Sequence, residues 1–125
     1  MTRKLVWPSI AALWACLACN EPVVQDPQLR HAMRSEGALV RGETLFIRYC
    51  SICHGKKGDG RGQRRAALSS SAASFIDPSF QKRITPERAL EVVREGKRGS
   101  SMPAFRWMDE PDLMALIAYV WSLGG

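Results

Sequence analysis

The sequence has few residues of the types that bind metal ions, and this scarcity limits the sites that it can form. Only two histidines and four cysteines occur among its 125 residues. A structural zinc site takes four ligands, usually two CxxC pairs or one pair with two histidines. Cys50, Cys53 and His54 could provide three, but the other two cysteines lie near the N-terminus and His31 lies in a polar stretch. The scarcity therefore disfavours zinc binding.

Patterns typical of strands and of nucleic-acid binding are also missing. No run alternates between apolar and polar residues with period two, and no internal repeat is visible. A thioredoxin-like dithiol is expected beside a βαβ unit, so the lack of strands disfavours that use of the CxxC pair. The formal net charge of +6 is mild, and its basic residues are not interleaved with aromatic ones. This balance favours a partner with an acidic surface, and we expect no nucleic-acid binding.

No hydrophobic run is long enough to span a bilayer comfortably, which takes about 20 apolar residues. The chain starts with MTRK, and residues 5–18 then carry no charge. A positive start, an apolar middle and small residues at the end are typical of a secretory signal peptide. We therefore predict export and a leader over residues 1–19. A retained membrane anchor is the alternative.

The end of this leader, Ala18-Cys19, resembles the lipobox of bacterial lipoproteins. The resemblance implies that Cys19 is acylated after cleavage and holds the protein at the periplasmic side of the inner membrane. Cys16 stands where the lipobox usually has leucine, and cleavage without lipidation, giving a soluble periplasmic protein, is the alternative. Residues 20–37 follow with two prolines, many polar residues and no periodicity, and we predict a flexible tether there.

Residues 38–125 form the predicted compact domain, and every regular element expected in it is a helix. One helix, over residues 38–50, carries apolar residues at helical spacing and runs into the CxxC pair. A second is framed by an N-cap at Thr85 and by Gly96. A third begins at Asp109 and carries a strong apolar stripe. The loops are long for an all-α domain of this size, which indicates that something other than side chains fills its middle.

The stretch YCSICHG, from Tyr49 to Gly55, contains the pattern CxxCH. Cys50 and Cys53 lie about one helical turn apart, so both sulfurs can face one side and form thioethers to the two vinyl groups of a haem. His54 can then bind the iron through one imidazole nitrogen. This interpretation uses every specified residue of the motif, and the predicted export agrees with it. We therefore predict one covalently attached haem c.

Residues 38–125 also resemble a class I cytochrome c domain. The segment GETLFIRYCSICHGKKGDG resembles its first helix, haem motif and glycine loop, and DEPDLMALIAYVWSL resembles its last helix. Between them, ITPERALEVVREGKRGSSMPAF resembles the helix and loop that deliver the second axial ligand. The resemblance implies a small all-α fold with long loops around one covalent haem. It also implies that the first and last helices cross, with Gly42 and Phe46 meeting Tyr119.

The candidates for the second axial ligand are the methionines outside the leader. Met33 lies in the tether and Met114 in the last helix, which leaves Met102 and Met108. Met102 lies in a loop stiffened by the proline that follows it, and it matches the MP signature of the family. We therefore predict His54 and Met102 as the axial pair, with Met108 as the alternative.

Two strong axial ligands leave the iron without an open position, and a thioether raises the reduction potential. The expected function is therefore one-electron transfer to redox proteins, and we expect no enzymatic activity. Two alternatives stay open. The domain could be the electron-transfer subunit of a dehydrogenase or oxidase complex, or it could be a peroxidase-like enzyme, which would require Met102 not to bind.

The sequence departs from the family beside the haem motif. The family commonly has a proline whose carbonyl accepts a hydrogen bond from the ligating histidine, but no proline occurs between His54 and Pro78, so this partner is unassigned. Arg106 and Trp107 could approach the haem propionates. Alternatively, Arg106 could be solvated and Trp107 could be packed in the core.

Basic residues flank both haem loops. They could steer acidic partners, or they could be ordinary solvated charges. They are Lys56, Lys57, Arg61, Arg64, Arg65, Lys97 and Arg98.

Overall fold

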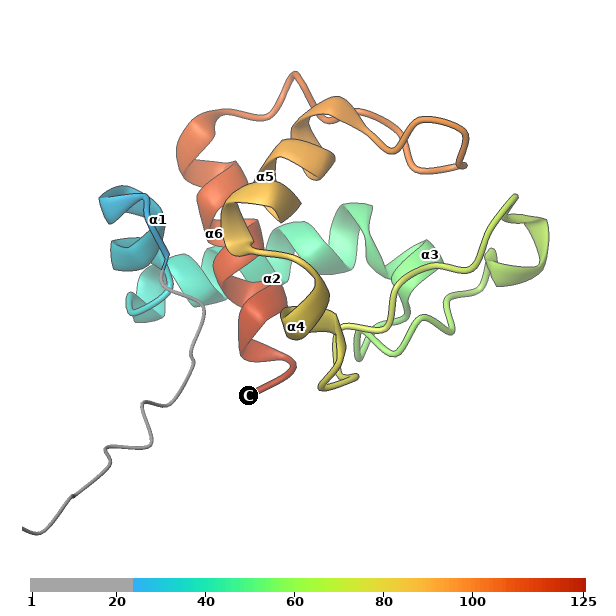
Figure 1. Ribbon diagram of the computed structural model, residues 1–125, viewed down its shortest axis with the longest axis horizontal. Coiled ribbons are helices and arrows are strands. Elements are labelled where there is room, and N and C mark those ends of the chain that lie inside the picture. The colour runs from blue at the N-terminus through green and yellow to red at the C-terminus, as the bar shows by residue number, and fades with distance from the viewer. Residues whose placement is uncertain (1–23) are drawn as a thin grey trace, which may run out of the picture.

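A computed structural model of the chain describes residues 24–125, and within this range every regular element is a helix (Figure 1). The helices are α1 (Pro27–Ala32), α2 (Glu36–Tyr49), α3 (Ser51–His54), the 3₁₀ turn η1 (Arg65–Ala67), α4 (Phe80–Arg83), α5 (Pro86–Glu95) and α6 (Glu110–Ser122). The predicted all-α fold class is confirmed. The predicted leader over residues 1–19, with Cys19, lies outside the described range. Within that range no helix is long and apolar enough to cross a membrane.

The centre of the fold is the crossing of α2 and α6, which make more extensive contact than any other pair of described helices (Figure 1). Gly42 lies against the backbone of α6, and the fully buried ring of Phe46 packs on Tyr119 with 5.4 Å between centroids. The predicted meeting of these three residues is confirmed. The apolar stripe predicted for the last helix is buried in full, as the core positions Leu113, Leu116, Ile117, Val120 and Trp121.

The starts of α5 and α6 are fixed by side-chain caps. The hydroxyl of Thr85 accepts a hydrogen bond from the N–H of Arg88 at 3.3 Å, and the carboxylate of Asp109 accepts one from the N–H of Asp112 at 2.9 Å. Each cap satisfies a backbone donor that the first turn leaves without an intrahelical partner. Gly96 ends α5 with a φ of +74°, which side-chain-bearing residues rarely adopt. Both predicted N-caps and the predicted end of α5 are confirmed.

The predicted flexible tether over residues 20–37 is wrong for the part that the structure describes. Here α1 packs on α6 and buries Leu29, which is 1% exposed. The carboxylate of Glu87, at the start of α5, accepts hydrogen bonds from the backbone N–H groups of Gln25 at 2.5 Å and Asp26 at 3.3 Å. The composition of the segment did not indicate that it packs on the domain, because its few apolar residues are spread among polar ones. These apolar residues are buried together only when the helix has formed.

Two long connections lie together at the end of the molecule opposite α1 (Figure 1). One follows α3 and the other follows α5. They are joined where the backbone N–H of Ser69 donates to the Ser101 hydroxyl at 3.0 Å, and the two hydroxyls lie 3.1 Å apart. The fold therefore brings the CxxCH motif and the loop that carries Met102 to the same end of the molecule.

Candidate functional site

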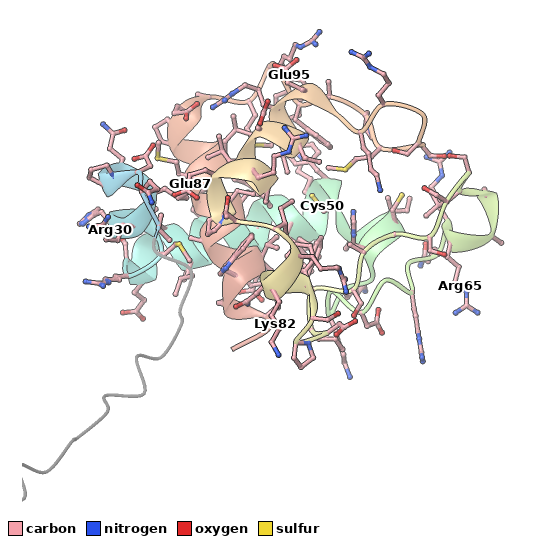
Figure 2. The ribbon with its side chains drawn as sticks, viewed as in Figure 1. Arg30, Cys50, Arg65, Lys82, Glu87 and Glu95 are labelled. Carbon is pink, nitrogen blue, oxygen red and sulfur yellow. The ribbon has the colours of Figure 1, made fainter. Side chains whose placement is uncertain are left out.

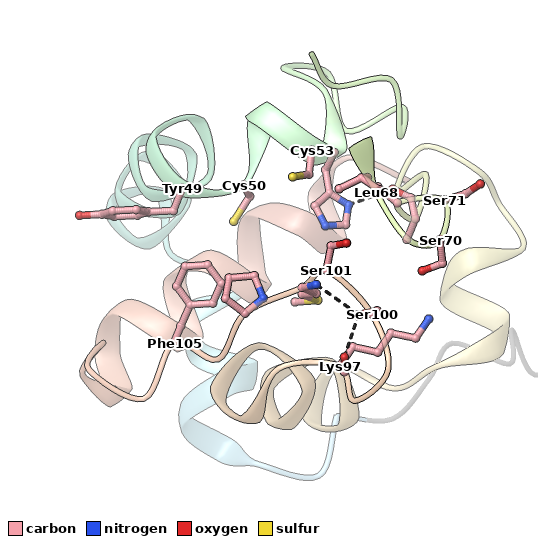
Figure 3. Close-up of a pocket in the computed structure, with 15 residues that line it drawn as sticks. Tyr49, Cys50, Cys53, Leu68, Ser70, Ser71, Lys97, Ser100, Ser101 and Phe105 are labelled. Atoms are coloured by element: carbon pink, nitrogen blue, oxygen red, sulfur yellow. Dashed lines mark hydrogen bonds between the residues drawn. The ribbon is translucent and has the colours of Figure 1, made fainter. Parts of the chain in front are cut away.

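A cavity that is partly open to solvent lies between α3 and the two connections (Figure 3). Cofactor sites are typically concave, with mostly apolar walls and a few polar groups. This cavity fits that description, since its apolar walls include Tyr49, Leu68, Pro103 and Phe105. The residues predicted to hold the haem all line it, and they are Cys50, Cys53, His54 and Met102.

The end of α2 positions the cysteines. The helix ends at Tyr49, and the chain turns at Cys50 before α3 begins. The N–H groups of Cys53 and His54 both donate to the carbonyl of Cys50, at 3.1 and 2.9 Å, so the motif is held in one turn. Figure 3 shows both sulfurs on the same side of α3, facing the loop after α5. Burial, with a smaller contribution from Cys53, raises the pKa of the Cys50 thiol to about 12.

His54 is held through one of its ring nitrogens. Nδ1 lies 3.1 Å from the carbonyl oxygen of Ala73, and if Nδ1–H donates to this carbonyl, Nε2 is the nitrogen left to bind a metal. Burial lowers the pKa of His54, and the hydrogen bond to Ala73 offsets this in part, which favours the neutral imidazole that metal binding requires. Ala73 is therefore the partner that the sequence left unassigned. Every residue type has a backbone carbonyl, so no residue pattern marks this one.

The glycine loop after the motif lies against the same segment as His54. The N–H of Gly60 donates to the carbonyl of His54 at 2.8 Å, and the N–H of Gly62 donates to the carbonyl of Cys53 at 3.1 Å. Gly60 has a φ of +75°, and a Cβ atom there would lie 2.9 Å from the carbonyl oxygen of Ala72. Glycine meets both constraints, which explains why this loop can lie so close to the chain that holds the histidine.

The structure separates the two methionine candidates. Met102 lines the cavity, whereas Met108 is 5% exposed and belongs to the hydrophobic core. The loop around Met102 is held by hydrogen bonds within it. The N–H of Lys97 donates to the Met102 carbonyl at 3.3 Å, and the Met102 N–H donates to the Ser100 hydroxyl at 3.2 Å. Of the two, only Met102 lies in the cavity with the CxxCH motif.

Arg106 and Trp107 do not line the cavity, so the structure gives no support for their predicted approach to the haem propionates. Arg106 forms an ion pair with Glu95 at 2.5 Å. Trp107 is 64% exposed, so it is not a core residue, although its ring lies edge-on to Tyr49 with 5.1 Å between centroids. The polar side chains at the cavity come instead from Lys97 and from serines of the two connections. Serine is common in loops, so no residue pattern marks these positions.

The donors around the cavity fit a c-type haem. Two thiols, an imidazole and a thioether line one mostly apolar space, and a haem needs from the protein two attachment sulfurs and one or two axial ligands. Between residues 24 and 125, no group of three or more His, Cys, Asp or Glu side chains could hold a metal ion. The donor set therefore favours a haem iron, whose porphyrin already supplies nitrogen ligands, over a zinc ion.

Comparison with known proteins agrees with this donor set. Residues 37–120 match the family described as cytochrome C oxidase, cbb3-type, subunit III. The chain is 29% identical over 86 residues to the cbb3-type cytochrome c oxidase subunit FixP of Bradyrhizobium diazoefficiens, a match that covers 68% of this chain but 27% of that relative. A chain of the reducing HAO-like protein complex of Kuenenia stuttgartiensis has a similar fold, with a TM-score of 0.57 and 19% identity. That likeness covers 66% of this chain and 41% of the other.

Proposed function

The chain belongs to the cbb3-type subunit III family of cytochrome c domains, and from this premise we propose that its haem c is held by Cys50 and Cys53 and ligated by His54 and Met102. The domain carries one covalent haem and transfers electrons through it. The observation that carries the proposed ligand set is the shared cavity, which all four residues line.

The two proposed axial ligands come from different parts of the chain. His54 would bind the iron through Nε2, because Nδ1 is engaged by the carbonyl of Ala73. Met102 would supply its thioether from the loop after α5. When bound, the haem supplies a one-electron couple at its iron, and His/Met ligation raises the potential of that couple.

The protein's own part is to keep these ligands in place in both oxidation states. Backbone hydrogen bonds hold the His54 turn and the Met102 loop, so gain or loss of an electron requires little rearrangement. The apolar walls, of which Phe105 is 9% exposed, limit the access of water. With both axial positions filled, no site remains for a substrate, and we propose an electron carrier and not an enzyme.

The charge around the cavity supports redox partners with acidic surfaces. The seven basic residues that flank the haem loops are all exposed, and none forms an ion pair with another described residue. Lys97 lines the cavity itself, and Arg65 projects at the end of the molecule opposite Arg30 (Figure 2). Positive charge that is not neutralised locally attracts an acidic partner and orients it before contact.

We propose that the protein is exported, works on the periplasmic side of the inner membrane and is anchored there by a lipid on Cys19. The positively charged, apolar leader supports export, and Ala18-Cys19 supports lipidation. Since α1 is folded onto the domain, only residues 20–23 separate Cys19 from the described fold, a span of at most roughly 18 Å. Cys19→Ser should then move the protein from the membrane fraction to the soluble periplasm, and an unchanged distribution would contradict the anchor.

The alternative is that the chain is an electron-transfer subunit of an oxidase or dehydrogenase complex. The family description and the name of the FixP relative, both of which refer to an oxidase subunit, favour this alternative. Mild solubilisation of native membranes followed by size-exclusion chromatography distinguishes the two. A freely exchanging carrier elutes as a small haem protein, whereas a subunit co-elutes with a larger partner in a fixed ratio.

Voltammetry of the purified holoprotein tests the carrier function. A carrier should give one reversible one-electron couple, and hydrogen peroxide should not change the current because no axial position is open. A high-spin ferric spectrum together with a catalytic current in peroxide would refute the carrier and favour the peroxidase-like enzyme.

A further inference from the structure

The segment from Ala73 to Phe75 contacts His54 in two different ways. The carbonyl of Ala73 lies 3.1 Å from Nδ1, and the ring of Phe75 stacks on the imidazole, with 4.7 Å between centroids and 22° between planes. Phe75 is not among the residues that line the cavity, so its ring covers a face of the imidazole without occupying the space for the cofactor.

The ring of Phe75 is itself held firmly. Phe75 is 8% exposed, and its N–H donates to the carbonyl of Gly58 at 2.6 Å. Phe46 and Phe80 pack edge-on against it, with centroid distances of 6.0 and 4.9 Å. Since Phe46 belongs to the crossing of α2 and α6, the orientation of the Phe75 ring is fixed by the centre of the fold.

We propose that Phe75 is a positioning residue for His54, and that its ring, together with the Ala73 carbonyl, fixes the plane of the imidazole. A hydrogen bond to Nδ1 sets the direction of one ring atom but lets the ring turn about the line between donor and acceptor. A ring stacked on one face removes that freedom. The inference rests on the proposed role of His54 as an axial ligand.

Two properties of the haem iron depend on this contact. The plane of an axial imidazole determines how the iron d orbitals split, and the electron paramagnetic resonance g values of the ferric protein report that splitting. Exclusion of water from one face of the imidazole disfavours the more highly charged ferric form and so raises the reduction potential. Removal of the Phe75 ring should therefore spread the orientations of the imidazole and lower the potential.

The test compares three variants of the full-length holoprotein, Phe75→Leu, Phe75→Tyr and Phe80→Leu. Phe80 is a matched control, because it belongs to the same aromatic cluster and its ring contacts Phe75 and Trp121 but not His54. In Phe80→Leu, Phe46 still packs edge-on against the Phe75 ring. We expect Phe75→Leu to shift and broaden the ferric g values and to lower the midpoint potential. Phe75→Tyr, which keeps the aromatic face, should restore both, and Phe80→Leu should lower stability while leaving both near wild type.

Two results would overturn the proposal: wild-type g values and potential in folded Phe75→Leu, or equal shifts in Phe75→Leu and Phe80→Leu. If the leucine variant does not fold, Phe75→Met replaces it under the same criteria, because the unbranched methionine side chain adapts to the space that the ring leaves. A wild-type protein that lacks a low-spin His/Met spectrum would instead defeat the proposed ligation, so the two failures are distinguishable.

Discussion

Gly42 of α2 lies against the backbone of Ala115 in α6, so closely that a Cβ atom at Gly42 would fall 2.0 Å from the Ala115 carbonyl oxygen. The same atom would also lie 2.8 Å from the Cβ of Tyr119. This contact sets how deeply α2 packs on α6. It therefore sets where the C-terminal end of α2, which leads into Cys50, lies relative to the rest of the cavity.

Gly42→Ala should separate the two helices and destabilise the protein by about 1–3 kcal/mol or more, as overpacking of a close contact does. Urea unfolding of the holoprotein measures the change. Gly37→Ala in the same helix is the control, because the nearest atom to a Cβ there is the Ser35 hydroxyl at 3.9 Å. That variant should be neutral or more stable by up to about 1 kcal/mol. Equal effects at the two glycines would contradict the close crossing.

Covalent attachment depends on two of the four cysteines. The double variant Cys50→Ala, Cys53→Ala should lose the haem mass that mass spectrometry of the denatured protein otherwise detects. Each single variant should keep one thioether and leave one vinyl group unreacted, which shifts the pyridine haemochrome band. Cys16→Ala is the control, since Cys16 and Cys19 have CxxC spacing with Asn20 where the ligating histidine would stand. Loss of covalent haem in the control, or its retention in the double variant, would count against the assignment.

Positive charge at the cavity should affect electron transfer to small charged oxidants. Oxidation of the ferrous protein by ferricyanide should slow as the salt concentration rises, and oxidation by a cationic cobalt complex should accelerate. Lys97→Gln should weaken both trends. Arg88→Gln should not, because Arg88 already pairs with Glu91 at 2.5 Å and does not line the cavity. Rates that do not depend on ionic strength would rule out steering.

Acid should weaken the contact between α2 and α6. A hydrogen bond from Arg41, at 2.6 Å, lowers the pKa of Asp112 in the folded protein. The unfolded chain then binds the proton more readily, so the stabilisation is present above the unfolded pKa of about 3.9 and is lost as the pH falls through the folded pKa. Urea unfolding of the wild type and of Asp112→Asn at several pH values below about 5 measures this. The wild type should lose stability more steeply, and parallel curves would contradict the prediction.

Much of the fold could be predicted because its signals are local. Caps such as Thr85 and Asp109 mark helix starts by residue type, and the stripe on α6 marks its buried face by spacing. The docking of α1 could not be predicted in this way, because it depends on hydrogen bonds from Gln25 and Asp26 to Glu87, more than sixty positions along the chain.

The same distinction between local and long-range signals applies to the residues of the site. Cys50, Cys53 and His54 form a compact motif, and Met102 has a proline after it that marks its loop, so all four could be named from sequence. Ala73 could not, because its contribution is a backbone carbonyl. In the sequence, Phe75 cannot be distinguished from an ordinary core residue. Only the structure shows that its ring stacks on His54.

The near-infrared spectrum of the ferric holoprotein tests the central claim most directly. Ligation by Met102 predicts a thioether-to-ferric charge-transfer band in the wild type and in Met108→Ala, and its loss in Met102→Ala together with a lower reduction potential. Met108→Ala is a fair control because Met108 lies in the core and not at the cavity. A band that survives in Met102→Ala and disappears in Met108→Ala would contradict the account and move the sixth ligand to Met108.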